Sequence, residues 1–220
     1  KAYEDIARER SLTPEERQEM KLYNKLADAC TPLAKGLSSE YCNQNAYDCI
    51  QIHGGSGFMK DYACERLYRD ARITSIYEGT TQLQVVAAIR HVFTGTYAQL
   101  IEQCAAMPVC DCLAPQKAML DKMFETYKEV VAKVHEINDP AYTDFMARHL
   151  VEIAGNVFMG YLLVTDASRN AASEDAEVKA AAESLAKSAR VYCNLAQAEV
   201  ARHSTFINTV TPADMTSYQA

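Results

Sequence analysis

The sequence lacks any stretch in which apolar and polar residues alternate over more than a few positions. Such alternation is the pattern of a half-buried β-strand, so its absence argues against a sheet. No apolar run approaches the roughly 20 residues that a membrane-spanning helix needs. No secretory signal is recognisable either. We therefore expect an all-α protein that has no membrane span and is not secreted.

The sequence also lacks blocks of charge of one sign. Its 220 residues carry 22 basic and 29 acidic side chains, a formal net charge of -7, and the two signs are interleaved. Nucleic-acid-binding proteins gather basic residues in a patch or stripe, so we expect no nucleic-acid partner. Apolar residues make up 49% of the chain, which is enough for an ordinary globular core.

Eight cysteines are present, but neither a disulfide framework nor a zinc motif is evident. The length and the missing secretory signal argue against disulfides. Cys110 and Cys112 form the only close pair, and they lack further ligands at zinc spacing. Cys42 and Cys49 would share one helix face, as core residues do. We expect reduced, structural thiols and no metal site.

The first long helical pattern has clear ends. Thr13 precedes Pro14 and is followed three residues later by Glu16, which is the signature of a capped helix start. The apolar pattern then runs to Ile52 and stops at Gly54-Gly55. Pro32 should kink or split this helix, with Thr31 capping the second part.

After this helix, the sequence predicts a loop over residues 55–79, with a short helix near 65–69. Thr81 to Gln84 resembles a second capping box and should open a helix that continues through Ile101 and ends before Pro108. Residues 108–115 have the composition of a linker. We therefore expect a domain over residues 1–107 and a C-terminal helical extension over residues 108–220, packed on it.

Three further helices are predicted in the extension. The first covers about 115–137, and the second begins with Asp139 as cap and Pro140 at its first position. The third runs from about 174 to 203, and the tail from Ser204 should be extended or poorly ordered. The expected fold class is all-α, an antiparallel helical bundle with additional C-terminal helices.

Glu78 is the sharpest candidate for chemistry. It directly precedes Gly79 and lies near the expected helix start, where the helix dipole favours an acid. Apolar Ile73, Ile76 and Tyr77 could desolvate its carboxylate and prepare a general base. On local features alone, an acid at a helix entry that serves only the dipole is the simpler interpretation.

Other polar groups have simpler structural explanations. The glycines at 54, 55 and 57 would admit a phosphate, but no strand precedes them, so a helix stop is favoured. Arg66, Arg69 and Arg72 share a helical face and could meet a phosphate, although ion pairs with neighbouring acids are favoured. His149 and Glu152 are a weak hint of a metal-binding bundle.

Two blocks taken together resemble the C-terminal helical domain of the acyl-CoA dehydrogenase family. The first is Gln51-Ile-His-Gly-Gly-Ser-Gly-Phe58, and the second runs from Arg69 through Tyr77-Glu-Gly-Thr-Thr-Gln82 to Gln84. The resemblance covers about residues 15–105, and the spacing between the blocks also fits. Three more helices then follow, as in longer members of the family.

The resemblance implies a role for each matching residue. Glu78 is the catalytic base that removes the α-proton of an acyl-CoA thioester, and Gly79 contacts the substrate. The cofactor is FAD, which takes hydride from the β-carbon to give a trans-2-enoyl-CoA. The residues implied in cofactor binding are Thr80, Thr81 and Gln82, near the flavin dinucleotide, and Gln51, Ile52, His53, Gly54 and Gly55, which reach the FAD of a neighbouring subunit.

The family pattern also implies what lies outside this sequence. An N-terminal helical domain and a middle β domain precede this part in the family. The chain is therefore expected to be a fragment that is inactive alone and binds FAD weakly or not at all. The intact enzyme would be a homo-oligomer, a dimer or tetramer, that passes electrons to an electron-transfer flavoprotein. It would lie in the cytoplasm of a bacterium or the mitochondrial matrix of a eukaryote. The alternative is a non-catalytic helical module for assembly or partner binding.

Overall fold

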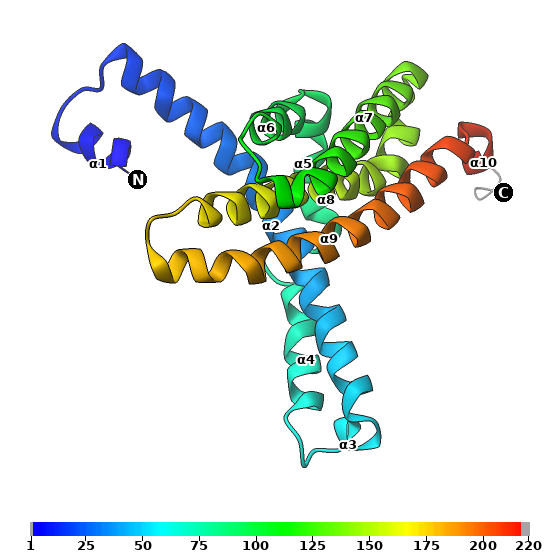
Figure 1. Ribbon diagram of the computed structural model, residues 1–220. Helices are drawn as coiled ribbons and strands as arrows, with labels where there is room; N and C mark the ends of the chain where they lie inside the picture. Colours follow the sequence, from blue (N-terminus) through cyan, green and yellow to red (C-terminus); the bar gives the residue numbers. More distant parts are fainter. Residues whose placement is uncertain (1, 217–220) are drawn as a thin grey trace.

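The computed structural model describes residues 2–216, and within them every regular element is a helix (Figure 1). The all-α prediction is therefore confirmed. In chain order the elements are α1 (Ala2–Glu9), α2 (Pro14–His53), α3 (Gly55–Phe58), α4 (Cys64–Thr74), α5 (Thr81–Phe93), α6 (Thr96–Ala105), the 3-10 helix η1 (Asp111–Leu113), α7 (Ala114–Ile137), α8 (Pro140–Ala171), α9 (Ala176–Thr209) and α10 (Pro212–Thr216).

Helix α8 is the centre of the bundle. It packs along α9 and also contacts α2, α5, α6 and α7 (Figure 1). Tyr142, Met146, Leu150 and Tyr161 of α8 are fully buried. Among the described residues, α8 is the one helix long and apolar enough to cross a membrane by length and composition. However, 67% of its apolar window is buried inside the structure, which is what a helix at the centre of a bundle requires.

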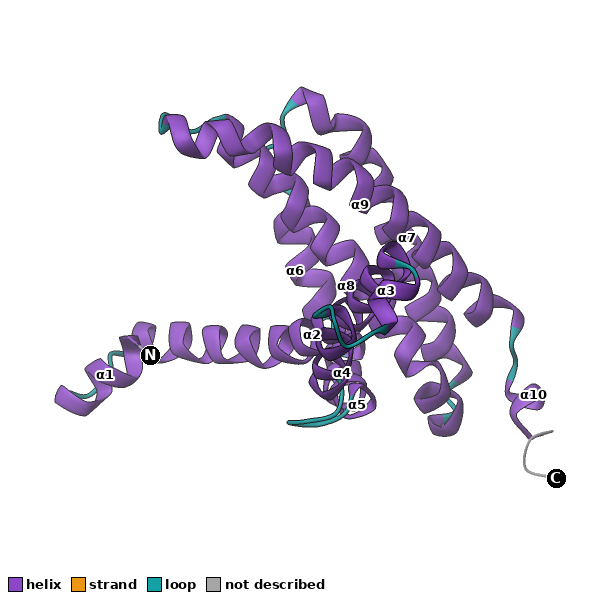
Figure 2. Cartoon of the chain, turned by 90° about the horizontal axis from the view of Figure 1, so that it is seen from below, coloured by secondary structure: helices purple, strands orange, loops and turns teal. Residues whose placement is uncertain are grey.

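Helix α2 joins the bundle to a projecting arm. Its buried residues all lie between Ala29 and Ser39, so both ends of this 40-residue helix extend beyond the core. The C-terminal end pairs with α4 through α3 (Figures 1 and 2). We call residues 40–74 the arm. The arm places a helical hairpin in solvent, away from the bundle.

The two strongest predicted helix starts are confirmed. The hydroxyl of Thr13 accepts a hydrogen bond from the Glu16 amide at 3.2 Å, and the Glu16 carboxylate accepts one from the Thr13 amide at 2.9 Å. Asp139 caps α8 by accepting from the amide of Ala141 at 2.9 Å. Each cap satisfies backbone donors that have no partner within their own helix.

Two predicted boundaries inside the first half of the chain are wrong. Helix α2 is not split at Pro32, and the Thr31 hydroxyl donates to the Ala27 carbonyl at 2.7 Å instead of capping a new helix. Helix α5 is capped by Thr80, whose hydroxyl accepts from the Leu83 amide. The Thr81 hydroxyl is used elsewhere, as a donor to Glu40 at 2.7 Å.

Three other stretches also differ from the prediction. Residues 55–79 are mostly helical, because α4 packs against α2 along the arm. The helix after Thr81 ends at Phe93, since Gly95 takes a φ of 70° and a new helix begins at Thr96. Helix α9 continues to Thr209 because Ile207 is buried and Tyr142 donates to the Val210 carbonyl at 2.9 Å. Residues 217–220 of the predicted tail lie outside the described residues.

The division into residues 1–107 and 108–220 stays a prediction. One cluster of buried side chains contains Leu37 and Val85 from the first part together with Val130 and Ile153 from the second. The two stretches therefore share a core.

Candidate functional site

Glu78 lies in the turn between α4 and α5 in a backbone conformation that few residues other than glycine adopt. Its φ is 52°, in the left-handed region, where a side chain costs roughly 1–2 kcal/mol. The side chain is exposed. Its carboxylate makes no hydrogen bond or ion pair with any residue of the described range 2–216. A strained residue with an uncommitted acid indicates a functional position.

Neighbouring groups hold this turn by its backbone. The Thr81 amide donates to the carbonyl of buried Ser75 at 3.2 Å. The Gln84 side chain donates to the Glu78 carbonyl at 3.1 Å, and Lys35 of α2 donates to the Gly79 carbonyl at 2.5 Å. These contacts fix the main chain on both sides of Glu78 and leave its carboxylate free for a reactant.

The surroundings of Glu78 differ from the sequence-based expectation. Ile73, Ile76 and Tyr77, which were expected to desolvate the acid, are themselves 44–53% exposed. They form no apolar wall around the carboxylate, so that expectation is wrong for this chain by itself. Any wall that keeps water from Glu78 must come from outside the described residues. The nearby N-terminus of α5 remains as a local source of positive potential.

Some of the residues that follow Glu78 are engaged in hydrogen bonds near the start of α5, and others are free on the surface. Gly79 is half-buried, whereas Thr80 and Gln82 are exposed. The Thr80 and Thr81 hydroxyls are already engaged, with Leu83 and Glu40 respectively. The Gln82 amide forms no hydrogen bond to the part of the chain that the structure describes. Gln82 is therefore the freest polar group on this side of the turn.

The residues Gln51 to Gly55 lie at the far end of the arm. They end α2 and begin α3, and all five are exposed. Helix α4, with 11 residues, separates them from Glu78, and such a helix is about 16 Å long. The structure thus does not bring the two predicted groups of site residues together within one chain.

The group Gln51 to Gly55 has room for the cofactor that the family resemblance implies. A Cβ atom added at Gly54 or Gly55 would meet nothing within 4 Å, so the backbone there is open to a ligand. Ile52 is 84% exposed and Phe58 77%, which leaves apolar surface uncovered beside polar Gln51. Exposed polar, apolar and backbone groups together suit a dinucleotide, which needs all three kinds of contact. The exposed groups at the end of the arm are therefore of the kinds that suit FAD.

Two other sets of candidates form contacts that differ from those expected. Among the described residues, neither Arg66 nor Arg69 forms an ion pair. Arg72 instead donates a hydrogen bond to the Ser75 hydroxyl, so the prediction that these arginines pair with neighbouring acids is wrong. Cys42 is exposed and Cys49 half-buried, so they are not core residues, although all eight cysteines are free thiols.

His149 and Glu152 form hydrogen bonds with different residues and not with a common ligand. A hydrogen bond of 2.7 Å joins the Nδ1 atoms of His149 and buried His203, while Glu152 accepts from Arg148 at 3.3 Å. Burial raises the pKa of Glu152, and Arg148 opposes that shift. Within residues 2–216 these two side chains join no cluster of potential metal ligands.

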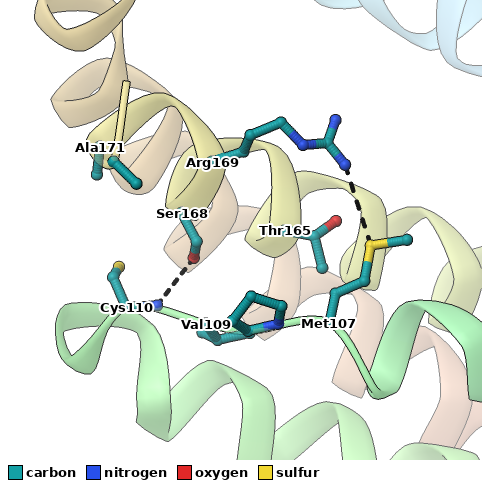
Figure 3. A pocket seen from close by; sticks show the side chains of 9 residues that line it. Met107, Val109, Cys110, Thr165, Ser168, Arg169 and Ala171 are labelled. Carbon is teal, nitrogen blue, oxygen red and sulfur yellow. Dashed lines mark hydrogen bonds between the residues drawn. The ribbon is translucent and has the colours of Figure 1, made fainter. Parts of the chain in front are cut away.

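The cavities do not coincide with Glu78. One of about 600 Å³ lies between the segment 107–110 and α8, where the Cys110 amide donates to the Ser168 hydroxyl at 3.0 Å (Figure 3). It contains none of the site residues expected from the sequence. Another of about 770 Å³ lies on the arm, lined by residues that include Gln51, Tyr68 and Arg69. Neither of these two cavities is lined by Glu78, which lies on open surface.

Comparison with known proteins assigns residues 15–215 of this chain to a family. The family model described as "Acyl-CoA dehydrogenase, C-terminal domain" matches residues 15–93, and "Acyl-CoA dehydrogenase C terminal" matches residues 93–215. The chain belongs to the acyl-CoA dehydrogenase family. The second match covers more than half of the chain and includes the helices that follow the site segment.

Several relatives show that the chain corresponds to a part of longer proteins. It is 45% identical over 64 residues to an acyl-CoA dehydrogenase of Bacillus subtilis, covering 29% of this chain and 17% of that protein. It is 52% identical over 52 residues to the caffeyl-CoA reductase-Etf complex subunit CarC of Acetobacterium woodii, covering 24% and 14%. A Bacillus anthracis acyl-CoA dehydrogenase solved with FAD superposes with a TM-score of 0.66 at 25% identity, covering 84% of this chain and 33% of that one. The dehydrogenase fold of the C-terminal part is thus shown, whereas two thirds of that structure have no counterpart here.

Proposed function

We propose that this chain is the C-terminal part of an FAD-dependent acyl-CoA dehydrogenase in which Glu78 is the catalytic base. The observation that supports this most is the conformation of Glu78, which is held at φ 52° with an exposed, unpaired carboxylate. A residue that served only the helix dipole would not need a left-handed backbone. This conformation instead presents the acid from a turn whose main chain is fixed.

The proposed role of the chain is to position the acid and accept a proton. The Glu78 carboxylate takes the α-proton of the acyl-CoA thioester, and a double bond forms between the α- and β-carbons as the β-hydrogen leaves with its electron pair. FAD, when bound, accepts that hydride. Gly79 lies next to the base and would contact the substrate, while Lys35 and Gln84 hold the backbone carbonyls of this turn. Proton removal by a positioned base typically contributes about 10²–10⁴-fold to the rate.

The proposed cofactor contacts come from two chains. Thr80, Thr81 and Gln82 would approach the FAD beside Glu78 of their own chain. Gln51 to Gly55 would approach the FAD of a neighbouring subunit, since about 16 Å of helix α4 separates them from Glu78. A homo-oligomer would also cover the exposed Ile52 and Phe58. One chain without the other domains is then expected to bind FAD weakly or not at all.

A second candidate is the reverse reaction, reduction of an enoyl-CoA. CarC, one of the relatives, is named as a reductase subunit in a complex with Etf. In that direction Glu78 would deliver the proton to the α-carbon as hydride enters at the β-carbon. The same name supports an electron-transfer flavoprotein as the redox partner in either direction. Assaying the full-length protein with both acyl-CoA and enoyl-CoA separates the two directions.

The decisive test is Glu78→Gln in the full-length protein, which removes the base and keeps nearly the same shape. We expect turnover to fall by about 10²–10⁴-fold while FAD absorbance per subunit is unchanged. The matched control is Asp70→Asn, an exposed acid of α4, which should leave turnover within about twofold of the parent. Unchanged turnover in Glu78→Gln would rule out Glu78 as base, and this C-terminal part would then be a non-catalytic helical module for assembly or partner binding.

A further inference from the structure

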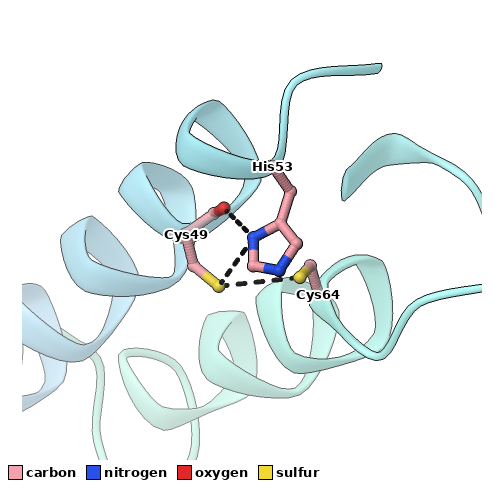
Figure 4. Close-up of side chains that lie close together, drawn as sticks. All are labelled: Cys49, His53 and Cys64. Atoms are coloured by element: carbon pink, nitrogen blue, oxygen red, sulfur yellow. Dashed lines mark hydrogen bonds between the residues drawn. The ribbon is translucent and has the colours of Figure 1, made fainter. Parts of the chain in front are cut away.

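Three potential metal ligands meet near the tip of the arm. Cys49 and His53 lie one turn apart at the end of α2, and Cys64 is the first residue of α4 (Figure 4). The chain between His53 and Cys64 folds back so that all three side chains converge. One ligand atom from each residue lies within 4.8 Å of the ligand atoms of the other two.

The three ligand atoms lie close to the spacing of a tetrahedral site. The sulfur atoms of Cys49 and Cys64 are 3.6 Å apart, and a ring nitrogen of His53 lies within 4.8 Å of both. With Zn–S bonds of about 2.3 Å and Zn–N bonds of about 2.0–2.1 Å, ligand atoms of a tetrahedral site lie about 3.5–3.8 Å apart. Little movement is therefore required to hold a cation between the three groups.

The His53 ring is already oriented for coordination. Its Nδ1 lies 2.8 Å from the Cys49 carbonyl oxygen and donates to it, so the proton is on Nδ1 and the lone pair on Nε2. The second ring nitrogen faces the Cys64 sulfur (Figure 4). Metal-bound histidines usually donate their other N–H to a carbonyl or carboxylate, which fixes the tautomer as it does here.

We propose that Cys49, His53 and Cys64 form a Zn²⁺ site, with three protein ligands and a fourth position open to water. Two thiolates and an imidazole are a soft ligand set that selects Zn²⁺ over Mg²⁺ or Ca²⁺. As the two Zn–S bonds form, the two thiol protons are released to solvent. Cys64 is buried and His53 is exposed, so the ion enters from the His53 side.

The site has a structural use in the arm. Helix α4 begins at Cys64 without a capping side chain, and residues 59–63 before it are exposed. A bound cation joins this uncapped start directly to the last turns of α2. It would hold the His53 ring, so contacts to a neighbouring FAD fall to Gln51, Ile52 and the open backbone at Gly54–Gly55.

The test is metal content and binding in the full-length protein. Purified under reducing conditions, it should contain about one zinc per chain by elemental analysis, the stoichiometry of a three-ligand site. After zinc has been removed by a chelator, added Co²⁺ should produce a thiolate-to-cobalt charge-transfer band. Cys49→Ser and Cys64→Ser should each weaken Zn²⁺ binding by more than about tenfold. The matched control, Cys42→Ser, changes an exposed thiol seven residues earlier on the same helix and should bind normally.

Two outcomes overturn the proposal. One is a parent protein that binds neither Zn²⁺ nor Co²⁺ when its thiols are reduced, a measurement that depends on no variant. The other is zinc binding that is unchanged when both Cys49 and Cys64 are replaced, which would show adventitious binding only. FAD absorbance and circular dichroism of the same samples show whether a variant has lost its fold, and they report the proposed flavin function separately from the metal.

Discussion

At the residue scale, Glu78 combines a costly backbone with an unpaired acid. The left-handed conformation is held by Gln84 and Lys35, which contact carbonyls and not the carboxylate. The sequence identified the acid from its place before Gly79 and a helix start. It did not reveal the φ of 52°, because nothing local requires it. One of the two contacts that hold the turn is long-range, since Lys35 is 44 residues from Gly79, whose carbonyl it contacts.

A buried histidine pair predicts how stability depends on pH. His203 is 3% exposed, and burial, followed by Arg202, His149 and Arg148, lowers its pKa to about 3. Glu199, 3.7 Å from its Nε2, is the nearby acid. The unfolded-state pKa of histidine is about 6.5, so the unfolded chain binds the extra proton between these values. Stability is then fully present above about pH 6.5 and falls on acidification, by at most about 1.4 kcal/mol per pH unit from this group.

Denaturant unfolding at several pH values between neutral and mildly acidic measures this slope. His203→Gln should reduce the loss on acidification, because the titrating ring is gone. Gln197→Ala, which changes an exposed residue of α9 that carries no ionisable group, should leave the slope unchanged. Equal slopes in the parent and His203→Gln would contradict the assignment.

At the element scale, the junction of α2 and α3 depends on a glycine. A Cβ at Gly57 would lie 2.8 Å from both the His53 Cβ and the Ile50 carbonyl oxygen, so main chain would have to move. We expect Gly57→Ala to destabilise the arm by about 1–3 kcal/mol, the usual cost of overpacking. Gly55→Ala is the matched control, since nothing lies within 4 Å there. Hydrogen exchange of α3 and α4 measures the difference, and equal protection in both variants would show that the junction tolerates the methyl group.

The sequence predicted helix starts better than helix extents. The caps at Thr13 and Asp139 were recognisable because each is made by groups within three residues of one another. The extent of α4 and the end of α9 were missed, because they depend on packing against α2 and on burial of Ile207. Distant contacts of this kind leave no signal in the local pattern.

The contrast between local and distant contacts also applies to the proposed metal ligands. Cys49 and His53 are four apart, a spacing that places two ligands on one helix face, and this signal was visible in the sequence. The third ligand, Cys64, is 11 residues further on. Only the fold of the chain around α3 brings it to the other two. Spacing in the sequence alone singles out Cys110 and Cys112, which are two residues apart.

At the scale of the whole molecule, the separation of Gln51 to Gly55 from Glu78 predicts complementation between subunits. A chain with Glu78→Gln keeps the segment Gln51 to Gly55 intact, which is here called the loop. A chain with Gln51→Ala and Ile52→Ala keeps the catalytic base intact. If the loop serves the neighbouring subunit, oligomers assembled from both variants contain some complete sites. Mixed assemblies refolded or co-expressed together should be more active than either variant alone.

The control for complementation is a mixture of the same two proteins that have been purified separately and not exchanged. Its activity should equal the average of the two variants. If co-assembled oligomers are no more active than this mixture, the loop and the base act on the FAD of the same chain.

Helix α2 gives the arm the mechanics of a lever. Its fulcrum is the stretch from Ala29 to Ser39, and Gln51 to His53 lie about 20 Å beyond it along one unbroken helix. A tilt of a few degrees at the fulcrum would move the tip by roughly 1–2 Å, and a misplacement of about 1 Å can cost an active site about 10²-fold in rate. Repacking around Leu33 and Leu37 would therefore displace Gln51 to His53 by more than it displaces the helix at the core, although neither leucine is near them.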